Sequence, residues 1–170
     1  IYTEQEMALI SRIVRKHDLA LIADEVYREF VYDGEYKSFG TMPELAEHLI
    51  MIDSVSKRYS ACGARIGCVM TKNKELSAQL LKCCQARLSV SQLDQAGATG
   101  LYTTPASYWE EVRNEYTRRR DTLKEALSAM PGVISSEPKG AFYVMVKLPV
   151  DNIEKFAQWL LTDFAIDNET

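Results

Sequence analysis

Residues 19–23 read Leu19-Ala20-Leu21-Ile22-Ala23, a short and continuous apolar run. Such a run is typical of a strand buried on both faces, as in a parallel sheet that helices cover on both sides. A helical pattern precedes it, because Thr3 and Glu6 have the spacing of a capping box and apolar residues then recur at helical intervals. The N-terminal segment is therefore predicted to be a helix followed by a buried strand.

The alternation of helix and strand continues along the chain. Two more buried strands are predicted at residues 50–52 and 66–70, and helical patterns cover residues 43–49, 73–85, 93–102 and 105–129. This order predicts an α/β fold with a mostly parallel sheet flanked by helices. A sheet of only three strands leaves apolar surface uncovered, so we expect the chain to be a piece of a larger protein.

The pattern changes after Pro131. One alternating strand is predicted at residues 140–146 and one helix at residues 152–164, which together resemble a separate α+β unit. We therefore place a domain boundary inside the preceding long helix, with residues 1–108 on one side and residues 109–170 on the other.

The composition excludes several classes of function. The chain has 170 residues, 46% apolar and 26% charged, which is ordinary for a soluble globular protein. Its net charge of −4 argues against nucleic-acid binding, and no apolar run is long enough to cross a bilayer. The four cysteines form no CxxC pair and lie far from both histidines, which predicts free thiols in a reducing cytoplasm and no metal site.

The richest polar segment runs from Asp53 to Gly67, directly after the second predicted strand. In open α/β sheets, ligands collect at the carboxyl ends of strands. Hydroxyl and guanidinium groups match phosphate oxygens, and glycines let the backbone approach a ligand closely. The segment therefore suits a phosphorylated ligand held by a covalent or charged anchor, and its candidate residues are Ser54, Ser56, Lys57 and Arg65.

A second polar group follows the first predicted strand. Asp24 and Glu25 come directly after Ala23, and Tyr27 lies three residues beyond Asp24. If the first two strands are neighbours in a parallel sheet, their carboxyl ends bring this carboxylate and this phenol to the same crevice as Lys57.

These motifs resemble those of a known family. Asp24-Glu25-Val26-Tyr27 resembles the D-E-x-Y element of class I and II aminotransferases, which are fold-type I enzymes that use pyridoxal 5′-phosphate (PLP). Ser54-x-Ser56-Lys57 with Gly63-x-Arg65-x-Gly67 resembles the lysine attachment signature of that family. Gly140-Ala141-Phe142-Tyr143 is similar to the strand that opens its small domain. The resemblance implies that residues 1–108 form the second half of the PLP-binding large domain and residues 109–170 part of the C-terminal small domain.

The resemblance also implies a role for each matched residue. Lys57 forms the covalent link to the PLP aldehyde and later moves the substrate's alpha proton, which requires a lowered pKa through burial or the nearby Arg58 and Arg65. Asp24 keeps the pyridine nitrogen protonated, and Tyr27 donates to the phenolate oxygen of the ring. The phosphate is held by Ser54, Ser56 and Arg65.

Each of these residues has an ordinary structural alternative. Lys57 can be an exposed loop lysine, Asp24 a helix cap and Tyr27 a half-buried aromatic residue. Arg65 can form a structural ion pair, and Glu25 is expected to be a solvated neighbour or part of the turn. Phe142 and Tyr143 are expected in the core. The joint spacing of the motifs favours the functional interpretation.

The resemblance implies an aminotransferase that moves an amino group between an amino acid and a 2-oxo acid, with aspartate as the expected substrate. It implies a cytoplasmic homodimer that binds neither nucleic acid nor membranes. No arginine follows Arg120, so the arginine that clamps the substrate carboxylate in this family is missing, and we expect this chain to be inactive alone. A C–S lyase or decarboxylase on the same fold, or a non-catalytic regulatory domain, remain the alternatives.

Overall fold

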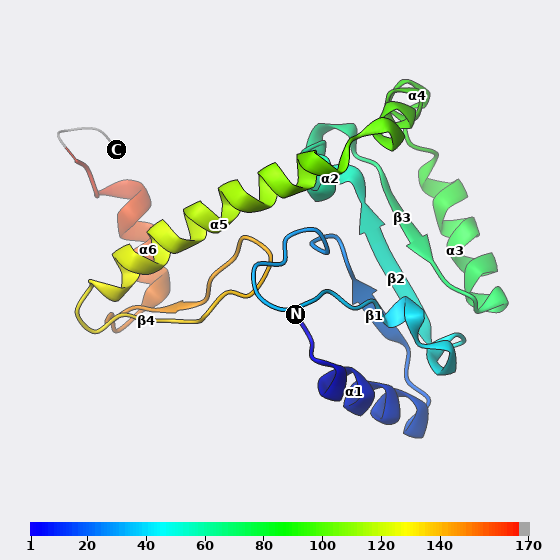
Figure 1. The fold of residues 1–170 in the computed structure, drawn as a ribbon, viewed down its shortest axis with the longest axis horizontal. Coiled ribbons are helices and arrows are strands. Elements are labelled where there is room, and N and C mark those ends of the chain that lie inside the picture. The colour runs from blue at the N-terminus through cyan, green and yellow to red at the C-terminus, as the bar shows by residue number, and fades with distance from the viewer. Residues whose placement is uncertain (167–170) are drawn as a thin grey trace.

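The computed structural model describes residues 1–166 and has the predicted α/β architecture (Figure 1). Three strands form one sheet in the order β1-β2-β3, with β1 at Leu21–Asp24, β2 at Leu49–Ser54 and β3 at Gly67–Met70. β1 and β2 are parallel, whereas β3 runs antiparallel to β2. The connection from β2 to β3 holds only short helical turns, which suits an antiparallel return better than a parallel crossover.

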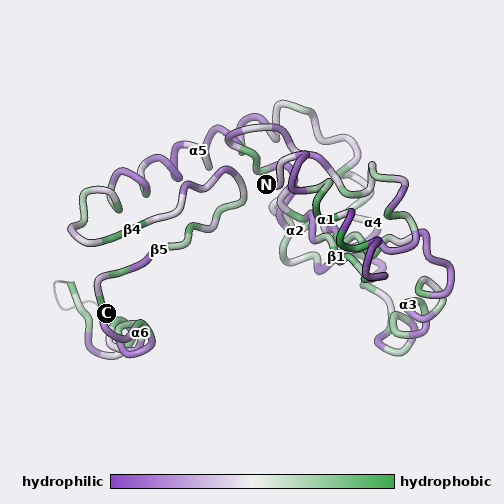
Figure 2. Tube along the Cα trace, turned by 90° about the horizontal axis from the view of Figure 1, so that it is seen from below, coloured by the Kyte–Doolittle hydropathy of each residue, from purple (hydrophilic) through white to green (hydrophobic). Residues whose placement is uncertain are grey.

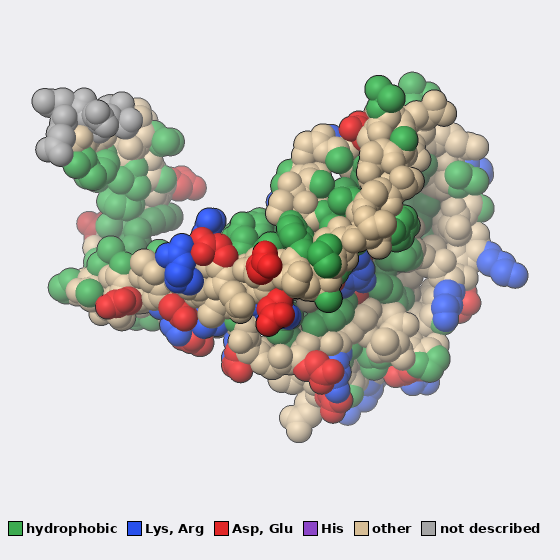
Figure 3. Space-filling model, turned by 45° about the horizontal axis from the view of Figure 1, so that its top comes forward, with side chains coloured by type: hydrophobic (Ala, Val, Ile, Leu, Met, Phe, Trp, Pro, Cys, Tyr) green, Lys and Arg blue, Asp and Glu red, His purple; other side chains and the backbone are tan. Residues whose placement is uncertain are grey.

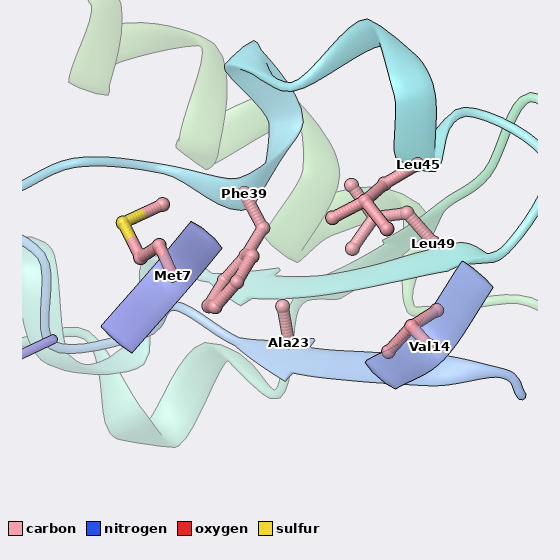
Figure 4. Close-up of a cluster of buried hydrophobic side chains, with 6 residues drawn as sticks. All are labelled: Met7, Val14, Ala23, Phe39, Leu45 and Leu49. Atoms are coloured by element: carbon pink, nitrogen blue, oxygen red, sulfur yellow. The ribbon is translucent and has the colours of Figure 1, made fainter. Parts of the chain in front are cut away.

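The core lies between the sheet and helix α1 (Glu4–Lys16), as Figure 4 shows. The predicted capping box is present, because the Thr3 hydroxyl accepts from the Glu6 amide and the Glu6 carboxylate accepts from the Thr3 amide at 2.7 Å. One face of α1 packs on the sheet and on the segment that leads into β2. The buried cluster consists of Met7, Val14, Ala23, Phe39, Leu45 and Leu49.

The helical segments follow the predicted order, with differences at their ends. Residues 43–49 form only the 3₁₀ helix η2 (Pro43–Leu45), because β2 already begins at Leu49. The predicted helix at 93–102 is divided into α4 (Gln92–Ala98) and the 3₁₀ helix η4 (Thr99–Thr103). The remaining elements are η1 (Phe39–Thr41), α2 (Val55–Arg58), η3 (Cys62–Ala64), α3 (Lys74–Arg87), α5 (Ala106–Ser128) and α6 (Ile153–Thr162).

The prediction of a strand at residues 140–146 is wrong for most of that range. Gly140 forms an isolated bridge with Val31, and a regular strand, β5, occurs only at Val146–Lys147, where it pairs with β4 (Ile134–Ser135). Ala141 has φ of 57°, in the left-handed region, so the extended alternation cannot continue through it.

Helix α5 connects two parts of the molecule. In Figures 1 and 2 it runs from the end of the sheet to the β4–β5 hairpin and α6, and the chain is elongated along this direction. Hydrophobic side chains gather on the surface of α6, where Trp159, Leu160 and Leu161 are exposed (Figure 3). None of the helices within residues 1–166 combines the length and apolarity needed to span a membrane.

Candidate active site

The predicted polar groups meet at one edge of the sheet. Asp24 ends β1 and Ser54 ends β2, and Asp24 is in register with Ile52 of the neighbouring parallel strand. The Glu25 amide donates to the Ile52 carbonyl at 2.9 Å, which keeps the two chains together just beyond the strand end. The expectation that the first two strands are neighbours is confirmed, and the turn that carries Tyr27 starts beside the chain that leads to Lys57.

Lys57 lies in α2, a helix of one turn directly after β2. Ser54 caps this helix, because its hydroxyl accepts from the Ser56 amide at 3.3 Å. The Lys57 side chain is half-buried, and its Nζ lies 5.7 Å from the centroid of the Phe142 ring. A cation at this distance from an aromatic face is attracted by the ring, so the amine is directed toward the 140–143 segment and is not a free loop lysine.

Tyr27 contacts the same segment. Its ring packs edge-on against Phe142, with centroids 5.0 Å apart, and its hydroxyl lies 2.6 Å from that of Tyr143. Burial raises the pKa of Tyr27, and the hydrogen bond to Tyr143 and the negative charge of Asp24 raise it further. The Phe142 ring therefore contacts both the Lys57 amine and the protonated phenol of Tyr27.

Asp24 stabilises the turn that presents Tyr27. One carboxylate oxygen accepts from the Val26 amide at 3.3 Å. Residues 26–29 form a turn and not a helix, so Asp24 is not a helix cap. The Asp24 side chain is exposed and lines a cavity of about 420 Å³ together with Tyr27 and Arg28.

The predicted phosphate-binding residues are engaged mainly with their own loop. The Ser56 carbonyl accepts from the Cys62 thiol at 3.2 Å, and Arg65 donates to the Cys62 carbonyl at 3.0 Å. Arg65 is exposed, adopts φ of 54°, and forms no ion pair with a carboxylate among the residues that the structure describes. Its guanidinium is therefore accessible to an anionic ligand, while Ser54 and Ser56 hold the backbone around Lys57.

Of the two glycines in the Gly63-x-Arg65-x-Gly67 motif, Gly67 is the one whose lack of a side chain matters for strand packing. It pairs with Ser54 across β2 and β3, and a Cβ atom there would lie 3.2 Å from the Asp53 carbonyl oxygen. Gly63, in contrast, faces open space. Gly67 therefore allows β3 to approach the strand that ends at the Lys57 helix.

Of the two expectations for Glu25, that of being part of the turn is confirmed, because its carbonyl accepts from the Arg28 amide at 3.2 Å, whereas that of being a solvated neighbour is wrong. Its side chain is buried, with the residue only 7% exposed, and accepts from the Phe39 amide at 3.1 Å, from the Ser38 hydroxyl at 2.7 Å and from the Tyr36 hydroxyl. Glu25 thus fixes the loop before η1 against the base of the site. Its position directly after a buried strand was the only signal in the sequence.

The expectation that Phe142 and Tyr143 lie in the core is also wrong. Tyr143 is 63% exposed and its ring packs against Tyr27 with centroids 5.4 Å apart, while Phe142 is 39% exposed. The left-handed conformation of Ala141 turns the chain here, so these two side chains face Tyr27 and Lys57.

Asp53 and its arginines form a network that the sequence did not reveal. Arg58 donates to Asp53 Oδ2 at 2.6 Å, and Arg28 lies 2.8 Å from the same oxygen. Arg58 was expected to act as a cation beside the Lys57 amine, but its guanidinium is paired with Asp53 and lies 3.5 Å from Glu29.

Comparison with known proteins shows what this chain is similar to. The sequence model of the family described as "Aminotransferase class I and II" matches residues 1–166. An aspartate aminotransferase of Bacillus subtilis is 29% identical over 85% of this chain and 37% of its own length. The arginine–pyruvate transaminase AruH of Pseudomonas aeruginosa is 34% identical, over 82% of this chain and 35% of its own length.

Solved structures agree with these sequence matches. The aromatic aminotransferase from Pyrococcus horikoshii superposes with a TM-score of 0.82 at 29% identity, over 96% of this chain and 45% of that one. The aspartate aminotransferase from Thermus thermophilus with maleate gives a TM-score of 0.82 at 28% identity, over 95% and 43%. The chain spans less than half the length of each of these relatives.

Proposed function

The chain belongs to the class I and II aminotransferases, whose cofactor is PLP, and we propose that the full-length protein transfers an amino group between an amino acid and a 2-oxo acid. The observation that carries this proposal is the meeting of Lys57 and Tyr27 at Phe142, beside the exposed carboxylate of Asp24. An amine, a phenol and a carboxylate at the carboxyl edge of two parallel strands are the groups that a pyridoxal ring needs.

The residues present fit PLP. The cavity of about 420 Å³ beside Asp24 and Tyr27 is lined by neither Lys57 nor Arg65, so the fit is argued from the chemistry of the side chains and not from this cavity. Tyr27 keeps its proton because its pKa is raised, so it can donate to the phenolate oxygen of the cofactor. Lys57 and Arg65 add an amine for the aldehyde and an accessible guanidinium for the phosphate.

Each residue then has a defined role. When bound, PLP supplies an electron sink for charge at the substrate's alpha carbon. Asp24 would keep the ring nitrogen protonated, and Lys57 would anchor the cofactor and act as the acid and base that moves the substrate's alpha proton. Tyr27 orients the ring through its phenolate oxygen. The phosphate is held by Ser54, Ser56 and Arg65.

Aspartate is the proposed substrate, because aspartate aminotransferases recur among the relatives, including those of Bacillus subtilis and Thermus thermophilus. No arginine follows Arg120 in this sequence, so residues 121–170 hold no candidate for the arginine that clamps the substrate carboxylate late in the small domain of this family. We therefore propose that this chain is inactive alone, and that the full-length protein is a cytoplasmic homodimer.

The proposed domain division follows the path of α5. Residues 1–108 form the second half of the PLP-binding large domain, and residues 109–170 form part of the C-terminal small domain. This division is supported by α5, which leaves the sheet and continues to the β4–β5 hairpin (Figure 1). Residues 167–170 lie outside the described part of the chain.

The test uses the full-length protein that carries this sequence. With PLP bound, its visible absorbance should shift on addition of aspartate and return on addition of a 2-oxo acid. Lys57→Ala should abolish both changes, whereas Lys72→Ala, an exposed lysine outside the site, should leave them intact. Absence of any absorbance shift with amino acids would contradict the proposal. Release of ammonia or pyruvate without a 2-oxo acid would favour the lyase instead.

A further inference from the structure

Asp53 is a buried carboxylate that makes several polar contacts at the end of β2. The residue is 7% exposed, its Oδ1 accepts from the Ser54 amide at 2.8 Å, and its Oδ2 contacts Arg58 at 2.6 Å and Arg28 at 2.8 Å. A buried carboxylate is tolerated only when it is paired and hydrogen-bonded. Both oxygens of Asp53 meet this condition.

The two arginines come from the two segments that build the proposed cofactor site. Arg28 directly follows Tyr27, and Arg58 directly follows Lys57. Asp53 therefore connects, through one oxygen, the turn that presents the phenol and the helix that presents the amine.

Both segments are short, and each also has contacts of its own, such as those of Tyr27 with Phe142 and Tyr143. Tyr27 lies in a turn at residues 26–29, and Lys57 lies in a helix of a single turn. A helix this short has little stability of its own. Its orientation depends on its cap, on the chain around it and on the Arg58–Asp53 pair.

The charges in this cluster balance. Glu29 adds a second carboxylate, 3.5 Å from Arg58 and 3.9 Å from Arg28, so two cations face two anions. The side chains of Arg58 and Arg28 are only 15% and 28% exposed. Without the Asp53 charge, the two guanidinium groups would share only the more distant Glu29 and would repel each other.

We propose that Asp53 is a positioning residue, which sets the relative placement of Tyr27 and Lys57 by binding Arg28 and Arg58 at the same oxygen. The inference rests on the proposed function and extends it, because it assigns the spacing of the phenol and the amine to a buried carboxylate that is already paired with two arginines. Arg28 and Arg58 act through Asp53 in the same way.

The test is the Asp53→Asn substitution in the full-length protein, because asparagine keeps the shape of the side chain and removes its charge. Two quantities are measured: the dissociation constant for PLP, by equilibrium dialysis, and the share of cofactor that borohydride traps on the Lys57 peptide. The dissociation constant should rise about tenfold or more, by analogy with loss of the residues that orient metal ligands. The trapped share at Lys57 should fall in favour of other lysines while the circular dichroism spectrum is unchanged.

Two sets of variants separate positioning from general stability. Asp33→Asn is the matched control, because Asp33 is an exposed carboxylate paired with Lys139, and it should leave both quantities unchanged. Arg58→Gln should weaken PLP binding more than Arg58→Lys does, since lysine keeps the charge. The Asp53→Asn/Arg58→Gln double variant should be no worse than Asp53→Asn, because the two residues act as one pair.

The outcomes distinguish this inference from the proposed function. A wild-type protein that binds no PLP would overturn both. The inference alone would be overturned if the wild type binds PLP and Asp53→Asn leaves both the PLP affinity and the labelling of Lys57 unchanged. It would also be overturned if the effects of Asp53→Asn and Arg58→Gln on the dissociation constant simply multiply in the double variant. If Asp53→Asn fails to fold, the Arg58→Lys and Arg58→Gln pair decides, and equal PLP affinities in these two variants would contradict the inference.

Discussion

The hydroxyl oxygens of Tyr27 and Tyr143 lie 2.6 Å apart, although 116 positions separate the two residues in the sequence. This contact, with the packing of Phe142 against Tyr27 and Lys57, brings the segment after α5 to the edge of the sheet. The proposed cofactor site therefore uses residues from both sides of the proposed domain boundary, and movement of the 140–143 segment would change the surroundings of the phenol and the amine together.

Tyr143→Phe tests this contact. The substitution keeps the ring that packs on Tyr27 and removes its hydroxyl, so one cause of the raised Tyr27 pKa disappears and Tyr27 should ionise at a lower pH than in the wild type. Titration of the tyrosine rings by NMR measures this, with Tyr102→Phe, a 91% exposed tyrosine, as control. An unchanged Tyr27 titration would show that the hydroxyls do not interact.

Asp24→Asn separates cofactor attachment from chemistry. The variant should still bind PLP through Lys57, but it cannot hold the ring nitrogen proton with a negative charge. Amino-group transfer should slow by about a hundredfold or more, as for loss of other groups that stabilise developing charge. Single-turnover absorbance changes measure the rate, with Asp18→Asn, an exposed aspartate, as control. A transfer rate within a few fold of the wild type would contradict the role of Asp24.

The contact between Tyr36 and Glu25 should make the free energy of unfolding depend on pH in the alkaline range. Burial raises the pKa of Tyr36, and its hydrogen bond to Glu25 raises it further. In the folded state Tyr36 therefore keeps a proton that the unfolded chain loses above about pH 10. The contribution of Tyr36 to the free energy of unfolding is therefore complete below that pH and falls as pH rises above it. Tyr36→Phe should make this fall less steep, as measured by denaturant titrations at several pH values. Equal slopes in both proteins would contradict it.

Gly140→Ala tests the bend that carries Phe142 and Tyr143. A Cβ atom at residue 140 would lie 2.8 Å from the Phe30 carbonyl oxygen, so the bridge between Gly140 and Val31 must shift. The variant should lose about 1–3 kcal/mol of stability, as for other overpacked sites. Gly97→Ala, in open space on α4, should instead gain about 0.5–1 kcal/mol. Thermal unfolding measures both, and a Gly140→Ala variant as stable as wild type would refute the close contact.

Local patterns were sufficient to predict much of the fold. The apolar runs that became β1 and β2, the capping box at Thr3 and the long helix α5 depend on residues close together in the sequence, and these element types are confirmed. The prediction that the strands are buried on both faces is wrong for β1 and β3, because Ile22 is 63% and Val69 48% exposed. The parallel pairing of β1 and β2 also agrees with their continuous apolar character. Because these strands end side by side, the sequence also predicted that Asp24, Tyr27 and Lys57 lie at one edge of the sheet.

The remaining features depend on contacts that no local pattern encodes. The burial of Glu25 follows from donors 11 to 14 residues away, and that of Asp53 from two arginines on different segments. The exposure of Tyr143 follows from the left-handed conformation of Ala141, a residue with no intrinsic preference for it. The alternating pattern at residues 140–146 therefore predicted a strand where the chain turns.

The central claim is that Lys57 is the lysine that binds the cofactor. The most direct test is to saturate the full-length protein with PLP, reduce it with borohydride, digest it and locate the reduced cofactor by mass spectrometry. The account predicts one cofactor per chain on the peptide that contains Lys57, and loss of that label in Lys57→Ala. Label on a different lysine, or an unchanged label in Lys57→Ala, would contradict it.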